Sequence, residues 1–255
     1  MTLQIETVPC LSDNYAFLAH DPDTGDTAVI DVPEAAPILK ALADKGWTAT
    51  QVLLTHHHAD HVQGLDEILA KHDAKVVGAA ADAHRLPPLD TAVKEGETIK
   101  IGNESGEVID VSGHTVGHIA FHFPSSKVAF TADSLMALGC GRVFEGTMPQ
   151  MWESLQKLAA LPGDTTICSG HEYTAANARF ALTIDPDNPR LISRSEAIET
   201  ARANGQPTVP STLAEELATN PFLRAGDARV QDHLGMSGAN PAEVFAEIRT
   251  RKDNF

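Results

Sequence analysis

Short apolar runs alternate with amphipathic stretches over the first two-thirds of the chain. The apolar runs are rich in β-branched residues and are bounded by Gly, Pro, Asp or Asn, a pattern typical of strands. Between them, apolar positions recur at helical spacing, which predicts helices over 34–45, 60–71 and 149–160. Strands are expected at 3–8, 15–19, 27–31, 51–55, 75–78, 98–101, 107–111, 118–123, 128–131 and 165–168.

The pattern changes after His171, where strand-like runs nearly vanish. Asn188 and Pro189 have the residue types that begin helices, and Gly205 follows as a stop signal. Asn240 and the proline after it repeat this opening. The sequence therefore predicts a strand-rich α/β domain followed by a helical region, with the division placed at residues 1–172 and 173–255.

Composition narrows the class of protein. The 255 residues, 42% of them hydrophobic, are enough to form a substantial core. A net charge of −16 opposes binding of nucleic acid over the whole surface, and no apolar run is long enough to cross a membrane. The N-terminus "MTLQIETVPC" lacks the pattern of a secretory signal. Cys10, Cys140 and Cys168 are far apart, which predicts buried thiols. We expect a cytoplasmic monomer that binds neither nucleic acid nor a membrane.

Histidine is concentrated in the segment "THHHADH", directly after a predicted strand. Residues two apart in an extended segment point to the same side, so His56 and His58 can reach one metal while His57 points away. If a helix then begins near Asp60, the adjacent Asp60 and His61 turn toward a neighbouring position. This spacing suits two metal ions better than one.

Three more candidate ligands follow later apolar strands: His114, Asp133 and His171. Strand ends that converge on one edge of a sheet bring distant residues into one site. Imidazoles with a few carboxylates favour zinc, leave iron and manganese possible, and disfavour calcium and magnesium. We therefore expect two divalent ions, with the two-oxygen carboxylate of Asp133 able to bridge them. His118 and His122 share one face of a strand, and packing is the preferred interpretation for both.

Several segments resemble known families. The motif THxHxDH resembles the signature of the metallo-β-lactamase superfamily, which implies an αββα sandwich with a dinuclear metal site at one edge. Other segments resemble the glyoxalase II (hydroxyacylglutathione hydrolase) family: GCGRVFEGT (139–147), GHEYT (170–174), NARFAL (177–182), PSTLAEELATNPFLR (210–224) and FAEIRTRKDNF (245–255). Together these segments extend the resemblance essentially from end to end.

The resemblance implies a role for each matching residue. One metal ion would be held by His56, His58 and His114. The other would be held by Asp60, His61 and His171, with Asp133 bridging. Glutathione would be contacted by Arg142, Phe144, Tyr173, Arg249 and Lys252. Residues 1–172 would then be the catalytic domain and residues 173–255 the substrate-binding domain.

The implied reaction is hydrolysis of S-D-lactoylglutathione to D-lactate and glutathione, a step of methylglyoxal detoxification. Metal ions lower the pKa of bound water to about 7, so hydroxide becomes available near neutral pH. Asp60 and Asp133 are the candidate catalytic carboxylates, and Asp60 would help to orient the attacking hydroxide.

The chain departs from the family pattern at several positions near the metal ligands, including Ser112 where the family usually has proline and "IDVPEA" in place of a VDPG-like turn. The family usually has tyrosine where Phe144 stands, and its FTGDTLF segment reads "FTADSLM" here, with Ala132 in place of glycine. These differences concern substrate affinity and loop geometry, because no candidate metal ligand is lost.

The same residues allow competing interpretations. A persulfide dioxygenase with one iron is opposed by the C-terminal segments. A metal-binding scaffold without catalysis is opposed by the intact ligand set. From the residues alone, Arg249 and Lys252 would be a solvated basic C-terminus that favours the helix dipole.

Overall fold

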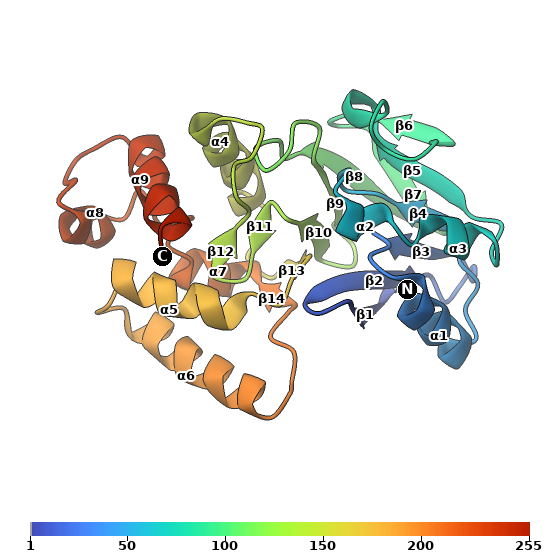
Figure 1. Cartoon of the computed structure of the whole chain (residues 1–255), viewed down its shortest axis with the longest axis horizontal. Coiled ribbons are helices and arrows are strands. Elements are labelled where there is room, and N and C mark those ends of the chain that lie inside the picture. Colours follow the sequence, from blue (N-terminus) through green and yellow to red (C-terminus); the bar gives the residue numbers. More distant parts are fainter. Residues whose placement is uncertain (1) are drawn as a thin grey trace. The chain divides into compact units, whose positions relative to one another are not determined.

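The computed structural model describes residues 2–255 and divides into two compact units (Figure 1). One unit consists of the chain up to Val111 together with residues 116–132, and the other of residues 112–115 together with 133–255. The candidate metal ligands are therefore divided: His56, His58, Asp60 and His61 belong to the first unit, and His114, Asp133 and His171 to the second.

The first unit contains a six-stranded mixed sheet. Its first three strands pair antiparallel, and the remaining pairs are parallel. The strands, in spatial order, are β1 (Gln4–Cys10), β2 (Asn14–His20), β3 (Thr27–Ile30), β4 (Gln51–Leu53), β5 (Lys75–Ala79) and β6 (Thr91–Val93). β3 and β4 are fully or almost fully buried, as expected for central parallel strands.

Two helices cover one face of this sheet: α1 (Ala35–Lys45) and α3 (Leu65–Leu69). Ile38, Leu42 and Ile68 are almost completely buried in the cluster that joins these helices to the sheet. Burying each such side chain contributes about 1.5–3 kcal/mol. α1 ends at Gly46, which has a left-handed φ of 68° that glycine adopts without strain.

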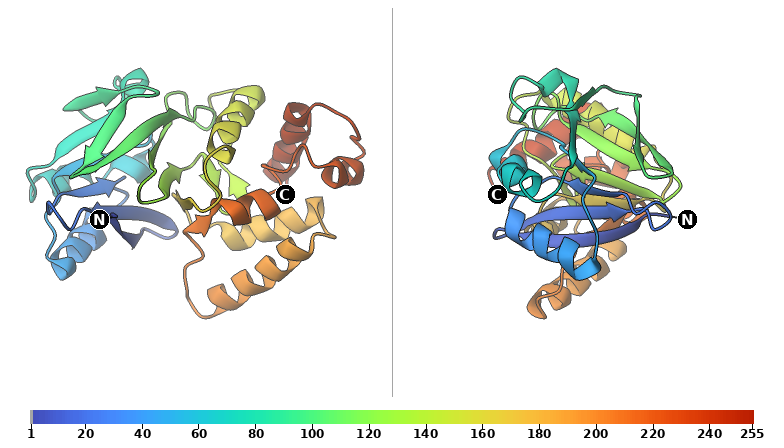
Figure 2. Two further views of the ribbon diagram at one scale, coloured as in Figure 1. Left: turned by 180° about the vertical axis from the view of Figure 1, so that it is seen from behind. Right: turned by 90° about the vertical axis from the view of Figure 1, so that its right-hand side faces the viewer.

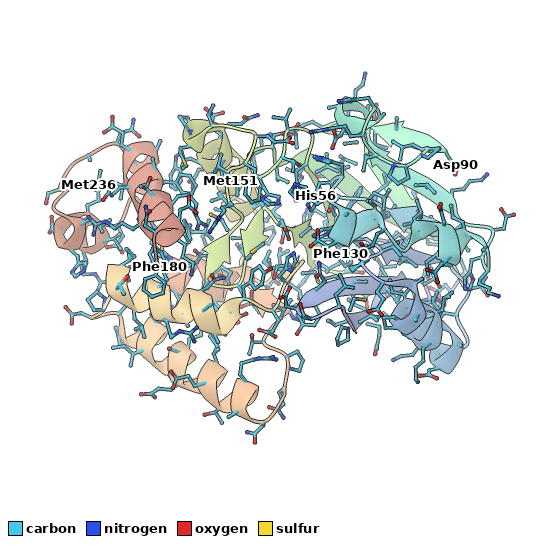
Figure 3. The ribbon with its side chains drawn as sticks, viewed as in Figure 1. His56, Asp90, Phe130, Met151, Phe180 and Met236 are labelled. Carbon is cyan, nitrogen blue, oxygen red and sulfur yellow. The ribbon has the colours of Figure 1, made fainter. Side chains whose placement is uncertain are left out.

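Four antiparallel strands form a second layer of the first unit: β7 (Thr98–Ile101), β8 (Glu104–Asp110), β9 (Ile119–Phe123) and β10 (Val128–Ala132). The Phe17 ring of β2 lies 5.8 Å from the ring of Phe130 on β10, which is labelled in Figure 3. The two sheets of this unit therefore pack face to face over an aromatic core.

The second unit is mostly helical (Figure 2). Its helices are α4 (Met148–Ala159), α5 (Thr174–Ile184), α6 (Pro189–Ala203), α7 (Leu213–Thr219), α8 (Ala228–Leu234) and α9 (Pro241–Asp253). The short strands β11 (Leu135–Met136) and β12 (Gly139–Cys140) form a hairpin, and β13 (Thr166–Ser169) pairs with β14 (Ser211–Thr212). The side chain of Asn188 accepts hydrogen bonds from the amides of Arg190 and Leu191, so it caps α6 as predicted.

The structure confirms the mixed α/β class with a helical C-terminal region. The helix predicted over 60–71 is wrong, because the chain forms α2 (Ala59–Val62) and α3 with a break at Gly64. The Gly64 amide donates to the carbonyl oxygen of Val32 at 3.0 Å and so does not make a helical hydrogen bond. A β-carbon at Gly64 would lie 2.8 Å from the Ala35 nitrogen, so this close approach requires glycine. The pattern also missed β6, β11, β12 and β14, which are too short to show a period. Among residues 2–255, no helix combines the length and apolar character needed to cross a bilayer.

Candidate metal centre and substrate site

His56 and His58 present neighbouring imidazole nitrogens, as their spacing predicts. Nε2 of His56 lies 3.1 Å from Nδ1 of His58, and the ring centroids are 4.7 Å apart. A tetrahedral zinc ion with bonds of about 2.0–2.1 Å places adjacent ligand atoms about 3.3 Å apart. The pair therefore fits two positions around one such ion.

Asp60 and His61 follow at the start of α2. Nε2 of His61 lies 3.9 Å from Oδ2 of Asp60. The Asn14 amide donates hydrogen bonds to Oδ2 of Asp60 at 3.0 Å and to its carbonyl oxygen at 3.1 Å. Asn14, at the start of β2, therefore fixes both the side chain and the backbone of Asp60.

Asp31 is a buried partner of this group that the sequence analysis missed. One carboxylate oxygen accepts the Thr55 amide at 2.8 Å, and the other accepts the Thr55 hydroxyl at 2.7 Å and Nδ1 of His61 at 2.8 Å. This bond keeps the His61 proton on Nδ1 and leaves Nε2 as the ligand atom. Asp31 has a left-handed φ of 57°, a strained conformation typical of functional loops. The sequence contained one indication of a role for Asp31, because it lies at the end of the strand predicted over 27–31.

Three further histidine rings lie beside the cluster. Nδ1 of His57 lies 2.9 Å from Oδ2 of Asp82, while its ring stays 5.0 Å from the ring of His58. The buried ring of His118 stacks on His56 with centroids 4.6 Å apart. His122 is also buried, and burial lowers its pKa.

The second unit brings its three candidate ligands together. Oδ2 of Asp133 lies 3.5 Å from Nε2 of His114 and 3.3 Å from Nε2 of His171. Nδ1 of His114 donates to the carbonyl oxygen of Arg142 at 2.7 Å, which leaves Nε2 directed at the carboxylate. A carboxylate between two imidazoles at these distances suits a ligand shared by two metal ions.

The backbone near Asp133 is tightly packed. A β-carbon at Gly141 would lie 2.0 Å from the carbonyl oxygen of Asp133 and 2.9 Å from Nδ1 of His114, so only glycine fits there. Ala132 has a left-handed φ of 41°, which is unfavourable for any residue with a β-carbon.

Two aromatic side chains lie against the ligands of the second unit. The ring of Phe144 lies 5.3 Å from that of His114, and the ring of Tyr173 stacks on His171 at 4.6 Å. Phe144 is 61% exposed and Tyr173 41% exposed. Both therefore offer accessible surface next to a candidate ligand.

Four cations lie near one another on α5, α9 and the segment after β12: Arg179, Arg249, Lys252 and Arg142. Nζ of Lys252 lies 5.2 Å from the ring centroids of both Phe180 and Phe255, and its pKa is lowered to about 8. Burial is the main cause, followed by the charges of Arg249, Arg179 and Arg142, and Asp253 opposes the shift. Arg179 was absent from the sequence-based predictions.

Arg249 is deeply buried, with 4% of its surface exposed. Its guanidinium donates to the carbonyl oxygen of Cys140 at 2.9 Å, pairs with Asp253 at 2.9 Å and lies over the ring of Phe222. Arg249 therefore anchors β12 to α9 and also adds positive charge. Arg142 is more exposed and lies 3.4 Å from the same Asp253 carboxylate.

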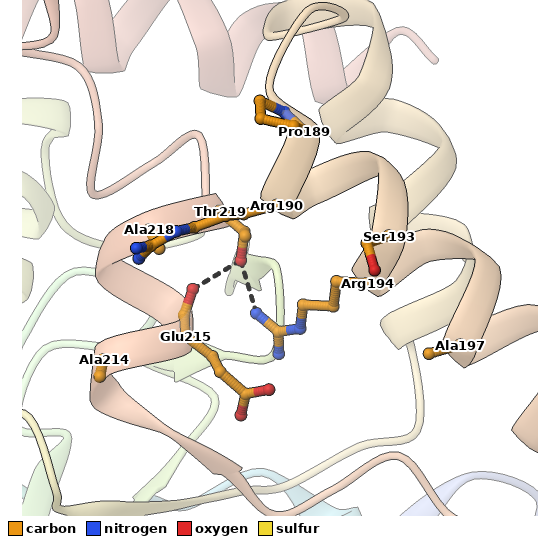
Figure 4. Close-up of a pocket in the computed structure, with 9 residues that line it drawn as sticks. All are labelled: Pro189, Arg190, Ser193, Arg194, Ala197, Ala214, Glu215, Ala218 and Thr219. Atoms are coloured by element: carbon orange, nitrogen blue, oxygen red, sulfur yellow. Dashed lines mark hydrogen bonds between the residues drawn. The ribbon is translucent and has the colours of Figure 1, made fainter.

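A groove of about 580 Å³ lies between α6 and α7 (Figure 4). Arg194 in its wall donates to the Thr219 hydroxyl at 2.7 Å and pairs with the buried Glu216 at 2.5 Å. None of the residues that line the groove is a candidate ligand or substrate contact, so it is separate from the chemistry described above.

Comparisons with known proteins agree with this arrangement. Residues 22–171 match the family model of the metallo-β-lactamase superfamily, and residues 172–255 match that of the hydroxyacylglutathione hydrolase C-terminus. The hydroxyacylglutathione hydrolase of Jannaschia sp. (strain CCS1) is 67% identical over 99% of this chain and 98% of its own length. That of Roseobacter denitrificans is 66% identical over the full length of both chains.

The chain belongs to the hydroxyacylglutathione hydrolase family. The resemblance found in the sequence is thereby confirmed. The crystal structure of the BLEG-1 B3 metallo-β-lactamase has a TM-score of 0.67 at 19% identity, covering 86% of this chain and 99% of that one. At this identity the likeness shows the fold alone. Family membership and the histidine–aspartate groups support a dinuclear metal centre.

Proposed function

We propose that this chain hydrolyses glutathione thioesters, with S-D-lactoylglutathione as the main substrate and D-lactate and glutathione as the products. The observation that carries the proposal is the Asp133 carboxylate between His114 and His171, in a chain similar over its full length to hydroxyacylglutathione hydrolases. The reaction would serve the detoxification of methylglyoxal.

In this proposal the two groups of ligands share one pair of divalent ions, with zinc preferred and iron or manganese as alternatives. His56, His58 and His114 would hold one ion, Asp60, His61 and His171 would hold the other, and Asp133 would be a ligand of both. The within-unit distances of 3.1–3.9 Å between donor atoms are compatible with such ions. The donor set of imidazoles and carboxylates also supports zinc over magnesium or calcium.

When bound, the ions lower the pKa of water and stabilise negative charge on the thioester oxygen and the departing thiolate. The protein's contribution is to hold its own donors in place. Asn14 fixes the Asp60 carboxylate, which would accept a hydrogen bond from the attacking water and orient it. Asp31 keeps His61 in the tautomer that presents Nε2.

The substrate would lie against the second unit. Exposed aromatic rings beside the candidate ligands offer apolar contact, and the nearby cations offer partners for the two glutathione carboxylates. We assign substrate contacts to Phe144, Tyr173, Arg142, Arg249 and Lys252, and we add Arg179. We also propose that residues 1–172 form the catalytic domain and residues 173–255 the substrate-binding domain.

We place the protein in the cytoplasm, as a monomer without nucleic-acid or membrane partners. The three cysteines are buried thiols, as predicted, and burial raises the pKa of Cys10 and of Cys140 to about 11. Buried thiols are consistent with a reducing compartment. The oligomeric state and the partners stay predictions.

The glutathione part of the proposal is tested with two thioesters of D-lactate, one with glutathione and one with N-acetylcysteamine, which lacks both carboxylates. We expect kcat/KM for the glutathione thioester to exceed that for the other by at least about 100-fold, equivalent to about 2.7 kcal/mol. Arg179→Ala should reduce this preference several-fold. The matched control is Arg190→Ala, which removes an exposed arginine from α6. Equal kcat/KM for the two thioesters would contradict glutathione recognition.

A further inference from the structure

Asp82 is a buried carboxylate that belongs to neither group of candidate ligands. It ends the short 3-10 helix η1 (Ala80–Asp82), which directly follows β5, and its side chain is completely buried. One carboxylate oxygen lies 2.9 Å from Nδ1 of His57, and the other accepts Nε of Arg85 at 2.5 Å. The carboxylate therefore has a strong partner on each oxygen, which a buried charge requires.

Arg85 extends this contact to a second segment. Its Nη2 donates to the carbonyl oxygen of Val116 at 2.9 Å. The next residue, Gly117, has a left-handed φ of 92°, and a β-carbon there would lie 2.9 Å from Cβ of Asp82. The chain around Val116 is thus held against η1 by one charged hydrogen bond and by a close approach that only glycine permits.

Both held segments lead to the candidate ligands. His57 lies between His56 and His58 in the chain, so fixing its ring fixes the backbone that carries both neighbours. Two residues after Val116, the ring of His118 stacks on His56 with centroids 4.6 Å apart. Asp82 therefore fixes the loop of His56 and His58 through His57. Arg85 fixes the segment of Val116 and His118, which packs against His56.

We propose that Asp82 and Arg85 are positioning residues that hold the loop of His56 and His58 in the geometry needed to bind metal. This inference rests on the ligand assignment of the proposed function. Asp82 acts through His57, Arg85 acts through Val116, and neither touches the metal or the substrate. Their removal allows the His57 ring and the loop backbone to rotate. The loop must then become ordered when metal binds, and the loss of conformational entropy weakens metal binding.

The test measures zinc affinity of the metal-free protein by competition with a chromophoric chelator, together with its melting temperature. Asp82→Asn keeps the size of the side chain and removes its charge. We expect it to weaken zinc binding by about 10- to 100-fold, the usual cost of losing a group that orients a metal ligand. Arg85→Gln keeps Asp82 beside His57 and should weaken binding several-fold. Asp82→Glu, which restores the charge, should recover part of the affinity.

Asp90→Asn is the matched control. Asp90 is a carboxylate of the same unit that accepts the Val76 amide and pairs with Lys75, without touching the ligand loop. It should change stability without moving zinc affinity more than twofold. If Asp82→Asn does not fold, Arg85→Gln decides alone.

Wild-type affinity in folded Asp82→Asn and Arg85→Gln, with only their melting temperatures lowered, would overturn the proposal. His58→Ala separates this failure from that of the ligand assignment. If His58→Ala also binds zinc normally, the ligand assignment is wrong. If it alone loses zinc, only the positioning role is wrong.

Discussion

At the scale of single residues, the candidate centre depends on conformations that the sequence only partly reveals. Period-two spacing predicted that His56 and His58 lie side by side, and their nitrogens are 3.1 Å apart. His57 bonds to Asp82, but its ring stays 5.0 Å from that of His58, so it is not fully turned away as predicted. The hydrogen bonds of Asp31 with His61 and of Asp82 with His57 could not be predicted, because they join residues 30 and 25 positions apart and follow from the fold.

Ala132 is the residue where the local sequence and the backbone disagree. A φ of 41° destabilises the folded state by about 1–2 kcal/mol for a residue with a β-carbon. Glycine removes this strain, but it also increases the conformational entropy of the unfolded chain, which offsets part of the gain. We predict that Ala132→Gly raises the free energy of unfolding by about 0.5–1 kcal/mol in urea titrations. Ala129→Gly on the same strand, where φ is ordinary, should lower it instead. A loss of stability in Ala132→Gly would refute the strain.

Phe144 is the second residue-scale departure. Its exposed ring lies beside His114, where the family usually has tyrosine. We predict that Phe144→Tyr lowers KM for S-D-lactoylglutathione by about two- to tenfold, because one added hydrogen bond is worth about 0.5–1.5 kcal/mol. kcat should change little, since the hydroxyl contacts bound substrate without taking part in the reaction. The measurement compares the steady-state kinetics of the wild-type protein and of Phe144→Tyr. An unchanged KM would contradict the predicted contact between residue 144 and glutathione.

At the scale of elements, most segments with a clear period were predicted, whereas β6, β11, β12, β14 and the interruption between α2 and α3 were not. β7 has its predicted bounds, α1 lies within its predicted range, and α6 begins at its predicted cap. The split of α2 from α3 arises where the Gly64 amide bonds to the carbonyl oxygen of Val32, a tertiary contact that overrides helical periodicity. α9 also differs from a simple basic tail, because Arg249 is buried against β12 while Lys252 is only partly enclosed.

The environment of Lys252 predicts a pH dependence. Its pKa of about 8 lies below the ordinary value because of burial and the charges of Arg249, Arg179 and Arg142, with Asp253 opposing. As pH rises through 8 the free protein loses this positive charge, so KM for the glutathione thioester should rise between pH 7 and 9. Between about pH 8 and the ordinary lysine pKa of about 10.4, the unfolded chain binds more protons than the folded protein does at this lysine. The contribution of Lys252 to the free energy of unfolding therefore increases as pH rises over this range, which stabilises the fold.

Lys252→Arg tests the assignment, because arginine keeps its charge throughout this range. The variant should show a KM that is nearly constant from pH 7 to 9. A wild-type KM that does not rise, or a variant that shows the same rise, would place the titrating group elsewhere.

At the scale of the whole molecule, the net charge of −16 and the local group of cations have different consequences. The net charge is an average over the sequence, whereas the cations of α5 and α9 gather beside the aromatic residues of the second unit. The fold class and the family could be predicted from the sequence because their motifs extend along the chain. The burial of Arg249 and the position of Arg179 near Lys252 could not be predicted from the sequence, since both depend on how the helices pack.

The central claim is that two metal ions per chain support hydrolysis of a glutathione thioester. The most direct measurement titrates metal-free protein with zinc and follows hydrolysis of S-D-lactoylglutathione in the same samples. We predict that activity rises to a plateau at two zinc ions per chain. A protein that holds two zinc ions per chain without hydrolysing the thioester, or that is fully active with one, would contradict the account.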